Sequence, residues 1–226
     1  MRGNRDTAGF DTLLDLVAMH GRTAAAILAG GMARRLAGVN KASLTVGGHR
    51  IIDRQLAALR QVAEPVFIVA GDPARFEGLG LDVVPDIMPN AGALGGIYTA
   101  IVRSPRDRTL IVACDMPFLG IPLLRHLTSV VDADLVIPRT RGGYEPLCAV
   151  YGKACAEPIR RRIEAGELKA AVLPDGVIVE EVGPEILAAY DPEGVLFVNV
   201  NTPHDWEQAQ SLTELEPEPR QDRITD

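Results

Sequence analysis

Short apolar segments alternate with longer helical patterns along most of this chain, and this alternation constrains the fold more than any other feature. Strands are expected over residues 24–28, 66–70, 82–84, 109–113 and 134–137. Apolar residues at helical spacing predict helices over residues 51–62, 93–102 and 117–130. Strands that alternate with helices form βαβ units, and strands that are mostly apolar suit a sheet covered on both faces. The expected fold class is therefore α/β with a mostly parallel central sheet.

The second half of the chain is less regular, although the alternation continues. Strands are expected over residues 147–151, 177–182 and 196–200, and helices over 158–165 and 203–212. We expect one domain over residues 23–213. Residues 1–22 are interpreted as an N-terminal extension with a short amphipathic helix at 11–19. Residues 214–226 contain five acids and two prolines, which predicts a disordered acidic tail.

Length and charge exclude several classes of protein. A chain of 226 residues suits one domain of roughly 150 residues with appendages. Its 23 Lys and Arg against 30 Asp and Glu give a net charge of −7, which argues against general binding to nucleic acid or an anionic membrane. No apolar run reaches the roughly 18 residues of a membrane span. The three cysteines form no CxxC pair, which argues against a disulfide framework or a zinc site and favours the cytoplasm.

A glycine-rich loop follows the first expected strand. Residues 28–41 read LAGGMARRLAGVNK, with Gly30 and Gly31 adjacent and with Arg35 and Lys41 further along. Adjacent glycines let the backbone approach anionic oxygens, and the two cations would supply charge for a triphosphate. The spacing is neither that of a P-loop nor GxGxxG. The alternative is a surface turn with solvated Arg and Lys side chains.

Two aspartates follow expected strands. Asp115 comes after residues 109–113, where it could bind Mg²⁺ through carboxylate oxygen or cap the helix after Pro117. Asp86 follows residues 82–84 and precedes a flexible segment that opens a helix. It would face a ligand at the carboxyl edge of the sheet or serve as an ordinary turn residue.

Two asparagines end the last expected strand. Asn199 and Asn201 would share one strand face by the two-residue period, so they could point together at a substrate. The alternative is that Asn201 or Thr202 caps the final helix.

Taken together, these segments resemble the molybdenum cofactor guanylyltransferases, a branch of the nucleotidyltransferases. The most specific matches are LAGGMARRLAGVNK (28–41), ACDMPFL (113–119), EPLCAVY (145–151) and FVNVNTP (197–203). The resemblance implies a Rossmann-like three-layer nucleotidyltransferase fold. It also implies Mg²⁺-dependent transfer of GMP from GTP to the terminal phosphate of molybdopterin bearing molybdenum, with release of pyrophosphate. Transient contact with other cofactor-biosynthesis proteins or with the receiving apoenzyme would follow.

The resemblance assigns roles to individual residues. Contacts to the nucleotide are implied for Leu28, Ala29, Gly30, Gly31, Lys41, Asp86 and Asp115. Catalytic roles are implied for Arg35, Lys41 and Asp115, with Asp115 as the Mg²⁺ ligand. Asn199 and Asn201 match the pair on the acceptor side. The sequence departs from the family pattern at Ala37, Asn40 and Val69, where family members often carry Gly, Asp and Asn respectively.

The absence of a histidine constellation agrees with this chemistry. A phosphate monoester has its second pKa near about 6, so it is already largely a nucleophile at neutral pH and needs no general base. Catalysis would then consist of positioning and charge neutralisation. The rival functions are a cytidylyltransferase that acts on molybdopterin or on a sugar or alcohol phosphate, and a non-catalytic nucleotide-binding protein.

Overall fold

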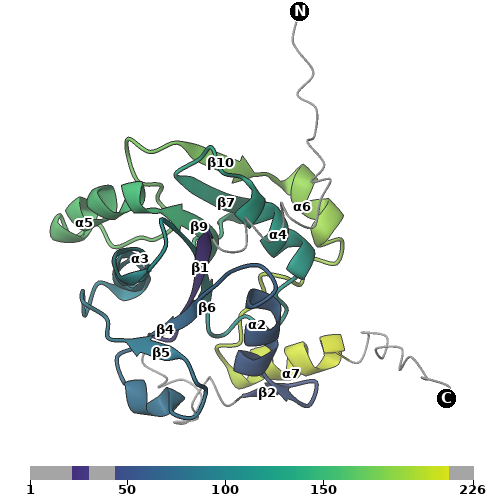
Figure 1. Cartoon of the computed structure of the whole chain (residues 1–226). Coiled ribbons are helices and arrows are strands. Elements are labelled where there is room, and N and C mark those ends of the chain that lie inside the picture. Colours follow the sequence, from purple (N-terminus) through teal and green to yellow (C-terminus); the bar gives the residue numbers. More distant parts are fainter. Residues whose placement is uncertain (1–21, 31–43, 214–226) are drawn as a thin grey trace, which may run out of the picture.

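A mixed, mostly parallel sheet forms the centre of the computed structural model, which describes residues 22–30 and 44–213. Within these residues the sheet has eight strands in the order β10-β7-β9-β6-β1-β4-β5, with β8 paired to β7 (Figure 1). Its strands are β1 (Thr23–Leu28), β4 (Val66–Val69), β5 (Asp82–Val84), β6 (Arg108–Ala113), β7 (Leu135–Thr140), β8 (Gly143–Tyr144), β9 (Cys148–Gly152) and β10 (Val179–Val182). The α/β fold class with a mostly parallel sheet is confirmed.

Pairing directions divide the sheet at β6. The strands β1, β4, β5 and β6 are mutually parallel. On the other side, β9 is antiparallel to both β6 and β7, while β10 is parallel to β7. Two reversals make β7 parallel to β6, so β1, β4, β5, β6, β7 and β10 all end at one edge of the sheet. We call this the carboxyl edge and the opposite one the amino edge.

Helices cover both faces of the sheet (Figure 1). One face carries α2 (Ile51–Leu59), α4 (Ile121–Ser129) and α6 (Pro184–Tyr190), and the other carries α3 (Gly92–Arg103) and α5 (Ala156–Glu164). Short 3₁₀ turns, η2 (Pro73–Phe76) and η3 (Lys153–Cys155), complete the connections. Alternate residues of β1 enter opposite layers, with Ile27 among α2 and α4 and Leu28 among the α3 side chains. Each fully buried Leu or Ile contributes about 1.5–3 kcal/mol by leaving water.

A third, smaller apolar cluster lies beside this sandwich. The hairpin of β2 (Thr45–Val46) and β3 (His49–Arg50) packs on α7 (Pro203–Thr213) around Val46, Val200 and Ala209, all fully buried. The Nε1 of Trp206 donates to the Thr45 carbonyl at 2.8 Å. The final helix α7 therefore holds the β2–β3 hairpin, which follows residues 31–43, against the rest of the domain.

Most expected elements are present, and two expectations are corrected. Residues 196–200 form no strand, because Asp191 accepts the backbone N–H groups of Val195 and Leu196, at 2.7 and 3.1 Å, in place of a neighbouring strand. The helix expected from residue 117 begins only at Ile121. Helix α6 was not expected at all. The expected helix at 11–19, the extension apart from Arg22, and the tail 214–226 lie outside the described residues.

Basic side chains at the amino edge bind helix ends. Arg108 donates to the carbonyls of Thr128 (3.2 Å) and Val130 at the end of α4, and burial lowers the pKa of its guanidinium. Lys153 donates to the carbonyls of Ile101 (2.5 Å) and Ser104 (2.8 Å) at the end of α3. Both cations thus satisfy carbonyls that a helix leaves without an intrahelical partner.

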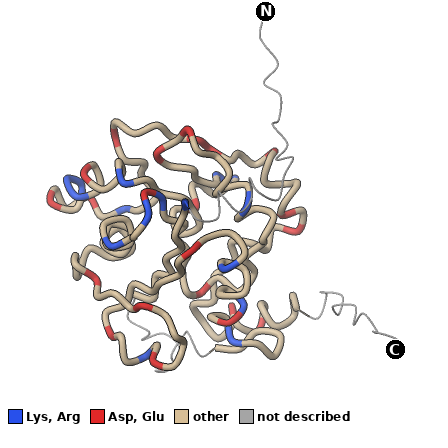
Figure 2. The backbone as a smooth tube through the Cα atoms, viewed as in Figure 1, with Lys and Arg blue, Asp and Glu red and all other residues tan. Residues whose placement is uncertain are grey.

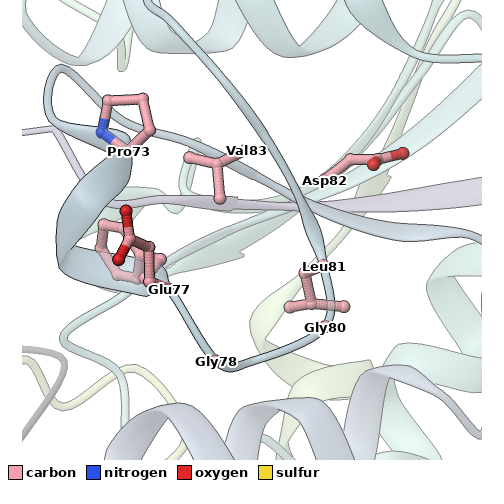
Figure 3. A pocket seen from close by; sticks show the side chains of 8 residues that line it. Pro73, Glu77, Gly78, Gly80, Leu81, Asp82 and Val83 are labelled. Carbon is pink, nitrogen blue, oxygen red and sulfur yellow. The ribbon is translucent and has the colours of Figure 1, made fainter.

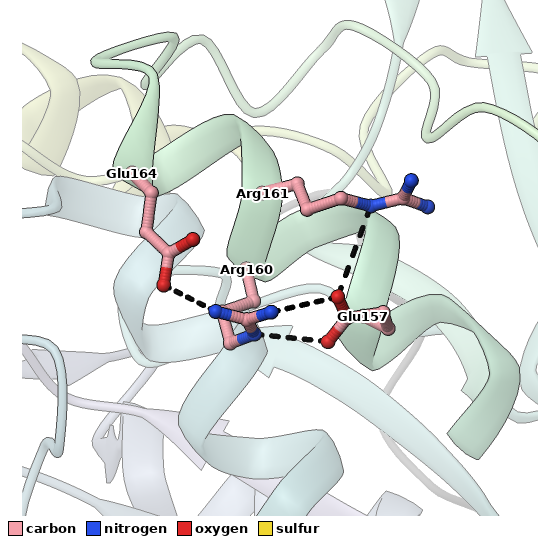
Figure 4. A network of polar contacts seen from close by, with 4 residues as sticks. All are labelled: Glu157, Arg160, Arg161 and Glu164. Carbon is pink, nitrogen blue, oxygen red and sulfur yellow. Dashed lines mark hydrogen bonds and ion pairs between the residues drawn. The ribbon is translucent and has the colours of Figure 1, made fainter.

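Exposed ion pairs lie along the surface of α5. Acidic and basic segments alternate along this helix (Figure 2). Arg160 bridges Glu157, at 2.7 Å, and Glu164, while Arg161 lies 3.9 Å from Glu157 (Figure 4). Because all four side chains face water, these pairs contribute little to stability.

Candidate active site

The carboxyl edge brings the start of the glycine-rich loop beside the turn that carries Asp115. Leu28 is in register with Val69 on one side and with Ala113 on the other. The backbone N–H of Ala29 donates to the Val69 carbonyl at 2.9 Å, and that of Cys114 donates to the Leu28 carbonyl at 3.1 Å. The loop and the aspartate, 85 residues apart in sequence, therefore leave the sheet side by side, as expected for a ligand site in an open parallel sheet.

Asp115 lies in a turn directly after β6 and does not cap a helix. The turn is closed by the Met116 N–H, which donates to the Ala113 carbonyl at 3.4 Å. Gly120 is the N-cap of α4, five residues further on. The capping alternative for Asp115 is therefore wrong. Its half-buried carboxylate at the carboxyl edge remains a candidate metal ligand.

A buried glutamine on α2 binds the backbone on both sides of Asp115. The Nε2 of Gln55, on α2, donates to the Ala113 carbonyl at 2.7 Å and to the Met116 carbonyl at 3.0 Å. Gln55 is fully buried among apolar side chains of the same helix. Sequence reasoning missed this residue. The available signal was an amide on a helix face that otherwise carries Ile52, Leu56 and Leu59.

The donor set at this edge fits Mg²⁺ only if substrate oxygens complete it. Within the described ranges, no three His, Cys, Asp or Glu side chains gather as a metal-binding cluster. Mg²⁺ commonly binds through one or two carboxylates together with substrate phosphates and water. Asp115, a hard oxygen donor beside the start of the glycine-rich loop, is suited to that shared coordination.

Asp86 helps to build the entrance to α3. Its Oδ1 accepts hydrogen bonds from the Met88 N–H (2.9 Å) and from the hydroxyl of Thr99 (2.7 Å), which is fully buried. The interpretation of Asp86 as a turn residue is confirmed, and its contact with a nucleoside stays a prediction. Gly95 keeps the entrance tight, because a Cβ there would lie 2.6 Å from the Met88 carbonyl oxygen.

The two asparagines do not share a strand face. The side-chain amide of Asn199 is exposed and donates to the Phe197 carbonyl at 3.2 Å. The Asn201 N–H donates to Oδ2 of Asp205 at 2.9 Å, and this bond is the main reason that the pKa of Asp205 is lowered. Thr202 caps α7 through its hydroxyl, which accepts from the Asp205 N–H at 3.1 Å, so the capping alternative is confirmed for Thr202.

Although it is not a strand, the asparagine segment reaches the proposed metal ligand. The backbone N–H of Val200 donates to the Asp115 carbonyl at 2.9 Å. Val200 is itself fully buried in the cluster beneath α7. Asn199 and Asn201 therefore flank a residue that is fixed against the Asp115 turn, which keeps both near the candidate site.

The structure describes the glycine-rich loop only as far as Gly30, whereas Gly31, Arg35, Ala37, Asn40 and Lys41 lie outside the described residues. Val69, where some relatives carry Asn, is 2% exposed and packs into the α3 layer.

Two of the three cysteines, Cys148 and Cys155, are buried thiols. Burial raises the pKa of the Cys148 and Cys155 thiols to about 12, so neither forms a thiolate at neutral pH. Within the described residues, Cys114, Cys148 and Cys155 form no disulfide bond.

A shallow cavity of about 390 Å³ lies beside the segment that joins β4 to β5 (Figure 3). It is lined by residues of the single segment 73–83, including Glu77 and Asp82. None of its lining residues belongs to the glycine-rich loop, the Asp115 turn or the asparagine segment.

Comparison with known proteins identifies the family to which the chain is similar. Residues 25–175 match the family described as MobA-like NTP transferase domain. The chain is 38% identical over 189 residues to a probable molybdenum cofactor guanylyltransferase of Pelotomaculum thermopropionicum, covering 83% of this chain and 92% of that protein. It is 33% identical over 187 residues to the molybdenum cofactor guanylyltransferase of Desulfosudis oleivorans, covering 82% and 93% of the two chains.

Solved structures give the same result at the level of the fold. The crystal structure of molybdopterin-guanine dinucleotide biosynthesis protein A from Archaeoglobus fulgidus superposes with a TM-score of 0.69 at 27% identity, covering 84% of this chain and 98% of that one. A 2-C-methyl-D-erythritol 4-phosphate cytidylyltransferase from Thermus thermophilus, at 16% identity and a TM-score of 0.57, shares the fold alone. No helix within residues 22–30 and 44–213 is long and apolar enough to cross a membrane.

Proposed function

Because this chain belongs to the family of MobA-like NTP transferase domains, we propose that it transfers GMP from GTP to the terminal phosphate of molybdenum-bearing molybdopterin. The guanylyltransferases of Pelotomaculum thermopropionicum and Desulfosudis oleivorans support this reaction through their similarity over more than four fifths of the chain. The observation that carries the proposal is the register of Leu28 with Ala113, which brings the start of the glycine-rich loop against the Asp115 turn.

The reaction requires little covalent chemistry from the protein. An oxygen of the acceptor phosphate attacks the α-phosphorus of GTP, the bond to the β-phosphate oxygen breaks, and pyrophosphate leaves. The acceptor is already largely ionised at neutral pH, since its second pKa is near about 6, so no side chain has to remove a proton.

The protein's proposed contribution is position and charge. Asp115 would hold Mg²⁺ together with phosphate oxygens, and the ion when bound would neutralise charge that develops on the phosphates. Arg35 and Lys41 would bind the triphosphate as cations, which strengthens each hydrogen bond to phosphate. Gln55 would hold the Asp115 turn in place at the edge of the sheet through its hydrogen bonds to the Ala113 and Met116 carbonyls.

Binding roles divide along the carboxyl edge. The nucleotide would lie over β1, β4 and α3, in contact with Asp86 and with the loop residues Leu28, Ala29, Gly30 and Gly31. The acceptor would lie toward Asn199 and Asn201, beyond Asp115. GMP transfer then occurs where the two binding regions meet.

A nucleotide panel tests the proposed reaction. With molybdenum-bearing molybdopterin as the acceptor, pyrophosphate release is measured for GTP, CTP, ATP and UTP, each with Mg²⁺ and with EDTA. We expect release with GTP and Mg²⁺, and only in the presence of the acceptor. Release with CTP but not GTP would overturn guanylyl transfer in favour of cytidylyl transfer, which the buried Val69 in place of Asn keeps as the second candidate. Nucleotide binding without turnover would indicate a non-catalytic protein.

A further inference from the structure

Glu145, which opens the EPLCAVY segment, lies at the carboxyl edge near the Asp115 turn. Its N–H donates to the Pro138 carbonyl at 3.0 Å, and its own carbonyl accepts from the Cys148 N–H at 3.1 Å, so the backbone is fixed on both sides. Two residues later, the Leu147 carbonyl accepts from the Ala113 N–H at 3.0 Å. Glu145 and Asp115 are thus each two residues from a backbone bond that joins their segments.

The side chain of Glu145 retains capacity to accept hydrogen bonds. Burial is the main reason that its pKa is raised, and the carboxylate receives a hydrogen bond of 3.3 Å from the Thr140 hydroxyl. That hydroxyl also lies 3.1 Å from the Gly143 carbonyl, and it has one proton to share between them. Among the described residues, no other side-chain or backbone donor bonds to this carboxylate. A half-buried carboxylate with so few protein donors can accept further hydrogen bonds from water or from a ligand that displaces the water.

The neighbouring Glu181 shows the contrast. Its carboxylate accepts from Arg139 at 2.8 Å and from the hydroxyl of Tyr144. Glu181 therefore has a cation and a phenol as partners, whereas Glu145 has a shared hydroxyl. Glu145 therefore has more capacity than Glu181 to accept hydrogen bonds from a ligand.

Strand order places Glu145 on the acceptor side of the site. β1, β4 and β5, which lead to the proposed nucleotide contacts, lie on one side of β6, and β9 and β7 lie on the other. Glu145 connects β8 to β9. Since Asp115 follows β6, it separates Glu145 from Leu28 and Asp86.

We propose that Glu145 determines acceptor specificity by accepting two hydrogen bonds from the 2-amino-4-oxopyrimidine edge of a pterin ring. That edge presents a ring N–H and an exocyclic amino group side by side, which match the two oxygens of one carboxylate. The inference rests on the proposed function, because it assumes a pterin-type acceptor beyond Asp115. Guanine has the same edge. Glu145 is assigned to the pterin and not to the guanine because Glu145 lies across β6 from the proposed nucleotide contacts.

Binding of two small pteridines tests the proposal without catalysis. The probes are a phosphorylated pterin and the matching phosphorylated lumazine, in which an oxygen replaces the 2-amino group, and binding is followed through pteridine fluorescence. We expect the native protein to bind the pterin at least about tenfold more tightly, because hydrogen bonds to a charged group are strong. In Glu145→Gln the preference should disappear, since an amide can donate to the new oxygen.

A matched variant and a nucleotide measurement complete the test. Glu181→Gln makes the same chemical change at a carboxylate that already has partners, and it should leave the preference for pterin unchanged. The dissociation constant for GTP should be the same in Glu145→Gln and in the native protein. Retention of the pterin preference in Glu145→Gln, its absence from the native protein, or a selective loss of GTP affinity would each overturn the inference. If the nucleotide panel fails while the pterin preference and its loss are observed, the fault lies in the proposed reaction and not in the role of Glu145.

Discussion

The two edges of the central sheet use charged side chains in opposite ways. At the amino edge, Arg108 and Lys153 donate to carbonyls at the ends of α4 and α3. At the carboxyl edge, the acidic side chains of Asp86, Asp115 and Glu145 lie in turns that backbone hydrogen bonds hold in place. Cations at the amino edge therefore satisfy helix carbonyls, whereas the carboxyl edge carries acidic side chains, of which Asp86 also supports its own turn.

The direction of the helices explains this difference. α3 and α4 each lie between two parallel strands and run back across the sheet, so their carbonyl ends gather at the amino edge and their N–H ends at the carboxyl edge. The dipoles and end groups of helices favour cations at the first edge and anionic ligands at the second. Variants at the two edges should therefore affect different properties.

The largest expected effect is loss of turnover in Asp115→Asn. The amide keeps the size of the side chain but removes the negative charge that a hard cation prefers. We expect turnover to fall on the order of a hundredfold or more, as when one preorganised electrostatic group is removed, with no change in melting temperature. Partial rescue by Mn²⁺, which accepts mixed ligands more readily, would support the metal role. Full activity at ordinary Mg²⁺ would exclude Asp115 as the metal ligand.

Gln55→Leu should affect both properties, because Gln55 connects the core to the carboxyl edge. Two buried carbonyls, those of Ala113 and Met116, would lose their donor, at a cost of about 1–3 kcal/mol in the free energy of unfolding. We also expect turnover to fall roughly tenfold as the Asp115 turn loses its support. Gln61→Leu is the matched control, since Gln61 is exposed and bonds only to its own helix region. Equal turnover in both variants would contradict a positioning role.

Arg108→Met should lower stability and leave the chemistry intact. The change removes the donor to the Thr128 and Val130 carbonyls and keeps the aliphatic stem. Urea denaturation should show a loss of about 1–2 kcal/mol, and turnover per folded molecule should be unchanged. A reduced turnover under conditions where the variant is fully folded would show that the two edges are not independent.

Removal of residues 214–226 should have the smallest effect. This segment is rich in acids and contains two prolines and few apolar residues, so it has little surface to bury. Neither the melting temperature nor the turnover should change measurably. A drop of several degrees in the melting temperature would show that the segment docks on the described part of the protein.

The sequence predicts the buried strands well because nearly every residue of these strands is apolar and is buried in the central sheet. β1, β4 and β6 begin and end within a residue of the expected positions. Residues 196–200 are also mostly apolar but form no strand, because Asp191 binds the backbone N–H groups at the start of this segment. Leu196 and Val200 then pack into separate clusters. Periodicity records that a side chain is buried, and it does not record in which layer.

Candidate site residues were predictable where they directly follow a strand, and not where their contacts join segments far apart in the sequence. Asp86 and Asp115 were identified because each follows an apolar run at the carboxyl edge. Gln55 was missed because its partners, Ala113 and Met116, lie about sixty residues away. Its burial within an apolar helix face becomes informative only once the fold is known.

The contact between α7 and the β2–β3 hairpin gives the protein a built-in optical reporter. Trp206 is the single tryptophan of the chain, and its indole N–H bonds to Thr45, four residues after Lys41. Indole emission responds to the loss or strengthening of such a bond and to the polarity around the ring. The indole can be excited at wavelengths longer than those that GTP absorbs. Titration with GTP should therefore change the fluorescence of the unlabelled protein if triphosphate binding shifts the end of the glycine-rich loop.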